Sequence, residues 1–256
     1  MNFDELDREM RVYETSHDHC VLPNLYMVAR LDGRTFTRLT KEVHQFESPF
    51  DERFRDMMLE TVEHLMNCGF PVIYGYTQSD EISLLFRKDI LTFNRKERKF
   101  NSILAGEANA KFSLLLGAMG IFDCRICQLP SVKIVVDYFR WRQEDAHRNA
   151  LNAHCYWLLR KQGQDMNAAT QALIGLSVAD KNELLFQNGI NFNDLPSWQK
   201  RGTGIYWDTV IKEGYNPITK ETVQAERRRL KRDLELKYHE GYEQFISGLV
   251  EKGEQA

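Results

Sequence analysis

The amino-acid sequence predicts an α/β protein of the α+β type, with a ferredoxin-like first half and a largely helical second half. Three observations support this prediction. Strand-like and helix-like segments follow one another in the order strand, helix, strand, strand, helix, strand up to residue 129. The segments beyond Pro130 are mostly helical in pattern, and a length of 256 residues suits one large domain with a substantial appendage.

The elements of the first half are predicted from the spacing of apolar residues. An apolar run over residues 25–31 predicts a strand that ends in Asp32. Residues 51–69 carry apolar side chains at helical spacing and close with a glycine. The stretch YGYTQSDEISLLF, residues 74–86, predicts two strands joined by a polar turn. A second helical stripe begins at Arg98, and FDCRICQL, residues 122–129, predicts the last strand.

Beyond Pro130 the pattern changes, so we predict a boundary there between residues 1–130 and 131–256. Residues 131–176 predict helices that break near Gly163, and residues 177–256 mix short apolar runs with turn signals. The segment ERRRLKRDLELKYHE, residues 226–240, is compatible with a helix. This segment is either a contact surface for nucleic acid or a solvated helix face. Its clustered cations are Arg227, Arg228, Arg229, Lys231 and Arg232.

The composition predicts a soluble, cytoplasmic protein. Five cysteines at irregular spacing favour reduced thiols. Cys124 and Cys127 are predicted to face opposite sides of a strand, which argues against a zinc site. The N-terminal residues are acidic and amphipathic, unlike a signal peptide, and no apolar run is long enough for a membrane span. Because the net charge is -3, a nucleic-acid partner needs a local basic patch.

Two aspartates at strand ends are the candidate catalytic residues. Asp32 ends the first strand and is followed by Gly33, and Asp80 lies in the later turn between Ser79 and Glu81. For the turn alone, a polar hairpin loop is the simpler interpretation. In a ferredoxin-like sheet, however, the first and third strands are central neighbours, so the two aspartates converge. Adjacent carboxylates repel one another unless a cation lies between them, and a pair of Mg²⁺ ions suits phosphoryl-transfer chemistry.

The chain has no Walker loop and no Rossmann glycine motif. Basic side chains are therefore expected to hold the phosphates of a nucleotide, and the candidates are Arg34, Lys99 and Arg125. Ser79 and the backbone of its turn are further candidates for phosphate contacts. Taken singly, each of the three cations has a surface or helix-capping role as its simpler explanation.

Five motifs, in this order, resemble those of the tRNA(His) guanylyltransferase family and its bacterial and archaeal relatives, the guanylyltransferase-like 3′-5′ RNA polymerases. They are ARLDGRTF, TQSDEISLLF, FDCR, DYFRWRQEDAHRNALN and KNELLFQNGINFNDLP, and they lie between Met10 and Thr203. The resemblance implies a palm-like catalytic domain in residues 1–130 and a region for RNA binding and oligomerisation in residues 131–256. It also implies a homotetramer built as a dimer of dimers.

The activity implied by this resemblance is magnesium-dependent nucleotidyl transfer to the 5′ end of tRNA. ATP first activates the 5′-monophosphate of the tRNA. The 3′-hydroxyl of GTP or another nucleoside triphosphate then attacks the activated phosphate, so the RNA grows in the 3′-5′ direction.

The resemblance also implies roles for individual residues. Metal ligands are Asp32, Asp80 and the carbonyl of Gly33, with Glu81 as a supporting catalytic carboxylate. Lys181 and Asn182 are weaker candidates for phosphate binding. The residues expected to bind nucleotide are Asp32, Gly33, Arg34, Thr35, Phe36, Thr37, Ser79, Asp80, Lys99 and Arg125. The residues expected to contact tRNA are His147, Asn149, Arg227 and Arg228.

Two motifs depart from the family pattern. The first motif commonly reads DGRGFH and here reads DGRTFT, so Thr35 and Thr37 replace a glycine and a histidine. Eukaryotic members carry HINN, which is linked to recognition of the tRNA(His) anticodon, and here the stretch is HRNA, residues 147–150. Ala150 therefore lacks an amide for base-edge hydrogen bonds. This departure favours the repair-type relatives, which restore missing 5′ nucleotides of truncated tRNAs by templated pairing.

Two other functions fit parts of the pattern. A nucleotide cyclase on the same palm fold also uses two metal-bound aspartates, but it needs no long helical region and no basic 226–232 cluster. A non-catalytic RNA-binding domain shares the strand order, but it presents aromatic side chains on its sheet where this chain presents carboxylates. The aromatic residues of the second half are assigned to packing, namely Tyr138, Phe139, Trp157 and Phe186.

Overall fold

The structure is a computed structural model that describes residues 1–216 and 221–255. Its first half contains α1 (Phe3–Thr15), β1 (Tyr26–Gly33), α2 (Phe36–Arg38), η1 (Leu39–Val43), α3 (Glu52–Asn67), β2 (Val72–Gln78), β3 (Glu81–Phe86), η2 (Thr92–Arg95), α4 (Glu97–Leu116) and β4 (Phe122–Leu129). Its second half contains α5 (Val132–Lys161), α6 (Met166–Leu173), α7 (Val178–Gln187), η3 (Phe192–Asp194), α8 (Ser197–Arg201), β5 (Thr203–Asn216), β6 (Glu221–Asp233) and α9 (Glu240–Gln255).

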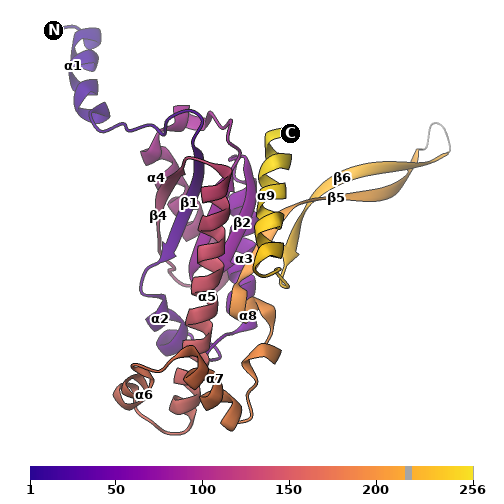
Figure 1. Cartoon of the computed structure of the whole chain (residues 1–256). Coiled ribbons are helices and arrows are strands. Elements are labelled where there is room, and N and C mark those ends of the chain that lie inside the picture. The colour runs from indigo at the N-terminus through magenta and orange to yellow at the C-terminus, as the bar shows by residue number, and fades with distance from the viewer. Residues whose placement is uncertain (217–220, 256) are drawn as a thin grey trace.

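One antiparallel sheet organises the molecule, with the strand order β4-β1-β3-β2-β5-β6 (Figure 1). Strands β1 to β4 with helices α3 and α4 follow the predicted βαββαβ order, and β1 pairs with both β3 and β4. The ferredoxin-like prediction is therefore confirmed, including the central position of the first and third strands. Because β1 and β3 are antiparallel neighbours, the end of β1 meets the turn that begins β3.

Helices cover both faces of the sheet. Helices α3 and α4 pack on one face, where they enclose Ala29 and Leu31 of β1. Helices α5 and α9 pack on the other face, where they enclose Tyr26 and Val28. This alternation follows from the period of two along a strand, and it accounts for the nearly continuous apolar run of β1. The same alternation places Cys124 and Cys127 of β4 against opposite clusters, as the sequence predicts.

The long helix α5 dominates the second half and crosses the sheet before it extends beyond the sheet's lower edge (Figure 1). Its N-terminus is capped by Ser131, whose hydroxyl accepts a hydrogen bond from the Ile134 backbone N–H. The helix ends just before Gly163, which has a φ of 93° and ends the helical pattern where the sequence predicts a break. Helices α6 to α8 pack around the lower half of α5.

Residues 226–232 lie in strand β6, so the helical interpretation of this segment is wrong. Strand β5 offers a partner over its whole length, and the pairing runs from Gly204 opposite Asp233 to Asn216 opposite Glu221. Pairing with a neighbouring strand thus overrides the helix propensity of the basic run. The result is a long two-stranded hairpin that extends away from the sheet (Figure 1).

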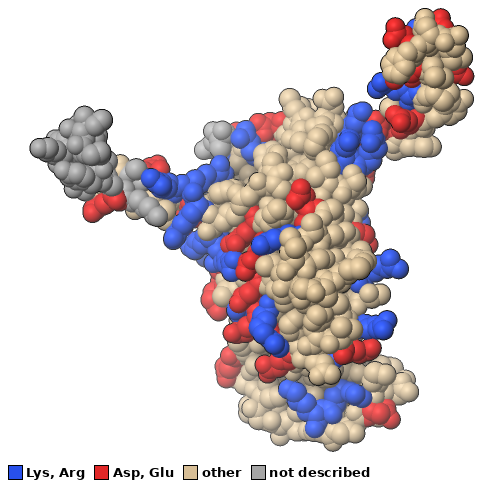
Figure 2. All heavy atoms as spheres, turned by 180° about the vertical axis from the view of Figure 1, so that it is seen from behind, with Lys and Arg blue, Asp and Glu red and all other residues tan. Residues whose placement is uncertain are grey.

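The strand conformation divides the basic cluster between two faces of the hairpin. Arg227, Arg229 and Lys231 alternate with Arg228 and Arg232, so the first three share one face and the other two share the opposite face. Figure 2 shows that Lys and Arg cover the part of the hairpin that joins the body.

Helix α1 has no buried residue and lies apart from the sheet (Figure 1). Among residues 1–216 and 221–255, no helix combines the length and the apolar character that a bilayer crossing requires. Because β5 pairs with β2, strands from both sides of Pro130 share one sheet. The division into units 1–130 and 131–256 stays a prediction.

Candidate active site

The end of β1 and the β2–β3 turn meet, as predicted. The Gly33 backbone N–H donates a hydrogen bond of 3.1 Å to the backbone carbonyl of Asp80. In the sheet register, Asp32 lies opposite Glu81 of β3 and opposite Asp123 of β4. The structure therefore brings Asp32, Gly33, Asp80 and Glu81 to one edge of the sheet.

Residue 33 must be a glycine because the side chain of Asp80 lies close to its backbone. A Cβ atom at residue 33 would lie 2.6 Å from Cδ2 of Phe36 and 2.7 Å from both Cβ and Oδ2 of Asp80. These distances are too short for any side chain, so the carboxylate of Asp80 packs directly over the glycine backbone.

Asp80 carries an uncompensated negative charge. The pKa of its carboxyl is raised from an ordinary 3.8 to about 6, chiefly because the carboxyl is buried, with a smaller contribution from the nearby charges of Asp32 and Glu81. Ser79 opposes this shift, because its hydroxyl donates a hydrogen bond of 3.0 Å to Oδ1 of Asp80. Among the ion pairs formed by the described residues, none involves Asp32 or Asp80. The two aspartates thus lack a protein cation.

Glu81 has different surroundings from the two aspartates. One of its oxygens pairs with Nη2 of Arg30 and the other lies 3.9 Å from Nη1 of Arg142. Both arginine side chains are buried, at 5% and 9% exposure. The carboxylate of Glu81 is therefore neutralised by the protein itself.

Two residues beside the carboxylates adopt left-handed backbone conformations. Ser79 has a φ of 52° and Thr35 a φ of 59°. For Thr35 this conformation is strained, because its branched Cβ crowds the backbone in the left-handed region. Strain of this kind is often found next to functional sites.

We expect Thr35→Gly to raise the free energy of unfolding by about 0.5–1 kcal/mol. The strain energy that is relieved in the folded state exceeds the free energy that the unfolded chain gains from its added conformational entropy. Urea unfolding measures this change. The control is Thr37→Gly, which removes a side chain from the short helix α2 and is expected to destabilise the protein. Equal losses of stability in both variants would show that Thr35 is not strained.

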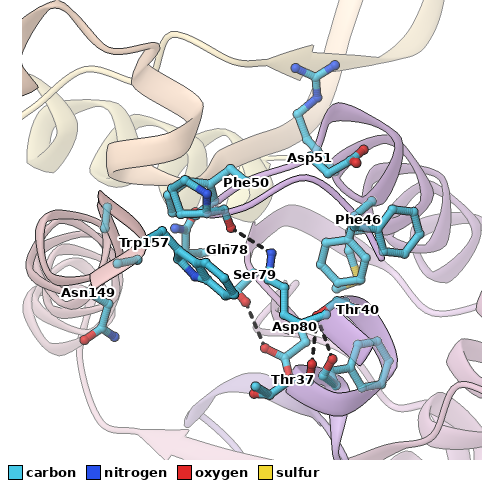
Figure 3. Close-up of a pocket in the computed structure, with 18 of the residues that line it drawn as sticks. Thr37, Thr40, Phe46, Phe50, Asp51, Gln78, Ser79, Asp80, Asn149 and Trp157 are labelled. Atoms are coloured by element: carbon cyan, nitrogen blue, oxygen red, sulfur yellow. Dashed lines mark hydrogen bonds between the residues drawn. The ribbon is translucent and has the colours of Figure 1, made fainter. Parts of the chain in front are cut away.

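A cavity of about 680 Å³ opens beside Asp80 (Figure 3). Segment α2–η1 and the loop at residues 44–51 form one side, and α5 forms the other. Figure 3 shows Thr37 and Thr40 on the first side, and Asn149 and Trp157 of α5 on the second. Of the predicted site residues, the cavity is lined by Phe36, Thr37, Ser79, Asp80, Glu81 and Asn149.

Several cavity residues were not predicted from the sequence. Lys41 Nζ donates hydrogen bonds to the carbonyls of Glu47 and Pro49 and lies 5.6 Å from the Trp157 ring centroid. Burial lowers the pKa of Lys41. Asp51 caps α3, and its hydrogen bonds with Arg53 lower its pKa to about 2. The three phenylalanines among residues 46–54 are the sequence signal for this wall.

The packing roles predicted for the aromatic residues hold in part. Phe139 is fully buried. Tyr138 is partly buried and packs against the same cluster. Trp157 instead lines the cavity. The prediction for Phe186 is wrong, because 66% of this residue is exposed on α7.

The predicted phosphate-binding cations are not gathered around Asp80. Lys99 lies on the first turn of α4, beside the contact between Lys96 and Asp18, whereas the last turn of α4 leads toward β4 and Gly33. Since α4 has 20 residues, its two ends are about 30 Å apart. The structure thus keeps Lys99 away from the carboxylates. Arg125 lies opposite Arg30 in the sheet, and Arg34 is exposed just beyond β1.

The residues expected to contact tRNA lie in two separate places. His147 stacks on Tyr238 and meets Phe192 edge-on, whereas Asn149 faces the cavity. Arg227 and Arg228 lie on the projecting hairpin. The Cζ atom of Arg228 lies over the ring of Trp207, 4.7 Å from the ring centroid. Ala150 is fully buried and lines the cavity. The amide of an asparagine at this position would therefore lie at the cavity wall.

The part of the chain that the structure describes contains no group of three or more His, Cys, Asp or Glu side chains placed to hold a metal ion. The candidate set is smaller, since it comprises two carboxylates and one backbone carbonyl. Its chemistry nevertheless suits a hard divalent cation, because all three ligands are oxygens and Asp80, which lies close enough to Asp32 to feel its charge, has no cation partner among the described residues.

Comparisons with known proteins agree in placing this chain beside one group of enzymes. A family model described as tRNAHis guanylyltransferase matches residues 7–130, and one described as Thg1 C terminal domain matches residues 133–244. A probable tRNA(His) guanylyltransferase from Drosophila melanogaster is 36% identical over 76% of this chain and 71% of the relative. The tRNA(His) guanylyltransferase of Debaryomyces hansenii is 32% identical over 89% of this chain and 91% of the relative.

Solved structures show the same similarity. A bacterial tRNA(His) guanylyltransferase (Thg1)-like protein in complex with GTP superposes with a TM-score of 0.74 and 28% identity, covering 96% of this chain and 99% of that chain. A structure of a protein of the same description in complex with ATP superposes equally well, with 26% identity and the same coverage.

Proposed function

The chain belongs to the tRNA(His) guanylyltransferase family, whose activity is nucleotide addition at the 5′ end of tRNA, and on this premise we propose a specific chemistry for it. The protein is a magnesium-dependent nucleotidyltransferase that extends tRNA in the 3′-5′ direction and repairs truncated 5′ ends. The observation that carries this proposal is the convergence of Asp32 and Asp80, two carboxylates without a protein cation, beside a cavity large enough for a nucleotide.

Asp32, Asp80 and the Gly33 carbonyl would hold Mg²⁺. When bound, such ions would supply positive charge that neutralises the charge developing on phosphate oxygens. The protein contributes the placement of these oxygens. The hydrogen bond from Gly33 N–H to the Asp80 carbonyl fixes the two strand ends, and the Ser79 hydroxyl orients the Asp80 carboxylate.

The cavity is the proposed nucleotide site. Relatives of this chain were solved in complex with GTP and with ATP, and we propose both nucleotides as substrates here. Phe46 and Trp157 offer aromatic surfaces for a base. Lys41, Arg55 and Arg160 add positive charge to the cavity wall. The proposed roles of Arg34 and Arg125 in binding phosphates stay predictions.

The proposed reaction has two displacements. A 5′-phosphate oxygen of the tRNA attacks the α-phosphorus of ATP and releases pyrophosphate, which leaves an adenylylated 5′ end. The 3′-hydroxyl of GTP then attacks the 5′-phosphorus of the tRNA and releases AMP, while the hydroxyl proton passes to solvent or to a nearby base. The new 5′ end carries the triphosphate of the added nucleotide.

The tRNA is proposed to contact both halves of the molecule. His147 and Asn149 lie on α5 near the cavity, and Arg227 and Arg228 offer cations on the hairpin for phosphate contacts. Template pairing within the RNA, rather than recognition of one anticodon, selects the added nucleotide in this proposal. A homotetramer remains our proposal for the assembly.

The test is incubation of the pure protein with Mg²⁺, ATP, GTP and a labelled tRNA that lacks its first nucleotide. We expect a product one nucleotide longer, formed faster on truncated tRNAs than on full-length tRNA(His), and we expect Asp32→Asn to abolish it. Cyclic nucleotide formed without RNA would instead support the cyclase alternative. Extension at a normal rate by Asp32→Asn would contradict the proposed metal site.

A further inference from the structure

Arg142 of α5 is a buried cation with incomplete pairing. Its side chain is 9% exposed, and its guanidinium lies 3.4 Å from the Trp141 ring centroid. Its nearest carboxylates are Glu81 at 3.9 Å and Asp145 at 3.7 Å. Its Nε is buried and has no hydrogen-bond partner among the described residues. A buried charge with this little compensation costs stability.

Glu81 connects this helix to the sheet. Its carboxylate lies between Arg30 of β1 and Arg142 of α5. Its own backbone carbonyl accepts a hydrogen bond of 2.9 Å from Thr77 Oγ1. Since Asp80 precedes Glu81 directly, any shift of Glu81 moves the turn that carries Asp80.

Arg142 also lies on the face of α5 that lines the cavity. Ala146, Asn149, Ala153 and Trp157 follow it at intervals of four, seven, eleven and fifteen residues, so all five share one side of the helix. The later four line the cavity. The contact between Arg142 and Glu81 therefore fixes the rotation of this cavity wall relative to the carboxylates.

We propose that Arg142 is a positioning residue for the active site, acting through Glu81, and that Glu81 is held by Arg30 and Arg142 instead of ligating the metal. The pairing sets Asp80 beside Asp32 and sets the α5 wall against both. This inference rests on the proposed function, because it assigns a division of labour among the three carboxylates of that site.

The test uses Arg142→Met, Glu81→Gln and the double variant. The matched control is Arg140→Met, which removes an exposed arginine from the same helix. Two quantities are measured: the dissociation constant of Mn²⁺ for the RNA-free protein, and the rate of nucleotide addition. Both are taken below the unfolding temperature of every variant.

Misplacement of reacting groups by about 1 Å costs about 100-fold in rate, so we expect Arg142→Met and Glu81→Gln each to slow addition by about 10- to 100-fold. The double variant should be no slower than the more severe single variant. Arg142→Lys should recover part of the rate, and Arg140→Met should keep it.

Mn²⁺ affinity separates positioning from a direct effect of charge. Arg142→Met removes a positive charge and Glu81→Gln a negative one, so a direct electrostatic effect would change Mn²⁺ affinity in opposite directions. Positioning predicts a weaker affinity in both variants. The inference would be overturned if the two variants changed Mn²⁺ affinity in opposite directions, or if Arg142→Met left this affinity unchanged. It would also be overturned if the two losses of addition rate multiplied in the double variant. If the wild-type protein binds Mn²⁺ but does not extend RNA, the proposed function fails, and the Mn²⁺ measurements still decide the role of Arg142.

Discussion

Asp80→Asn is expected to stop nucleotide addition and, in the same variant, to stabilise the metal-free protein. The loss of rate should reach about 10³-fold or more, because one of the two carboxylates proposed to hold Mg²⁺ is removed. The gain in stability follows from the charge that Asp80 carries without compensation in the fold. A residue kept for function at a cost in stability shows this combination of effects.

The stability gain should depend on pH. The pKa of Asp80 is raised in the folded protein from 3.8 to about 6, so the folded state binds a proton more tightly than the unfolded state does. The contribution of Asp80 to stability is therefore most favourable below pH 4 and is lost as the pH rises from about 4 to about 6. The difference approaches about 3 kcal/mol at pH 8, taking 1.36 kcal/mol for each pKa unit.

Urea unfolding of the wild-type protein and Asp80→Asn at pH 4 and pH 8, with a chelator present, measures this difference. The variant should exceed the wild type in stability at pH 8 and lose most of this advantage at pH 4. Addition of Mg²⁺ should then stabilise the wild type more than the variant, because a ligand stabilises only the state that binds it. A variant less stable than the wild type at pH 8 would show that Asp80 is already compensated.

Gly33→Ala is expected to damage both folding and activity. The added methyl group would lie 2.6–2.7 Å from Phe36 and Asp80, so either the strand end or the turn must move. Overpacking of this kind costs about 1–3 kcal/mol of stability. Displacement of Asp80 should also slow nucleotide addition by about 100-fold. Thermal unfolding and the extension assay measure the two effects.

Gly106→Ala is the matched control for this variant. Gly106 lies within α4, and no atom lies within 4 Å of the position that its Cβ would occupy. Alanine in a helix interior should stabilise the protein by about 0.5–1 kcal/mol and leave the extension rate unchanged. If Gly33→Ala kept the stability and the extension rate as Gly106→Ala is expected to do, Gly33 and Asp80 would not be tightly packed.

The first half of the fold follows from local patterns. Its strands show period-two or continuous apolar runs, its helices show apolar stripes, and the turn at Ser79 and Asp80 has favoured turn formers. The strand order then places Asp32 beside the turn without any further information. This is why the carboxylate pair was predictable, even though the two residues are 48 positions apart in the chain.

Features set by long-range packing were not predictable in the same way. The segment at 226–232 has the composition of a helix, and only its pairing with β5 makes it a strand. The position of Lys99 depends on the direction of α4 relative to β1. The cavity arises where Lys41 and its loop approach Trp157, and no local pattern joins residues so far apart in the sequence.

The most direct test of the proposed metal site is a crystal structure of the protein with Mn²⁺ and GTP, in which anomalous scattering locates the metal. We expect a manganese peak between the carboxylates of Asp32 and Asp80, with the Gly33 carbonyl as a further ligand and with Glu81 still paired to Arg30 and Arg142. A peak coordinated by Glu81, or manganese bound only through the nucleotide phosphates with both aspartates free, would contradict it.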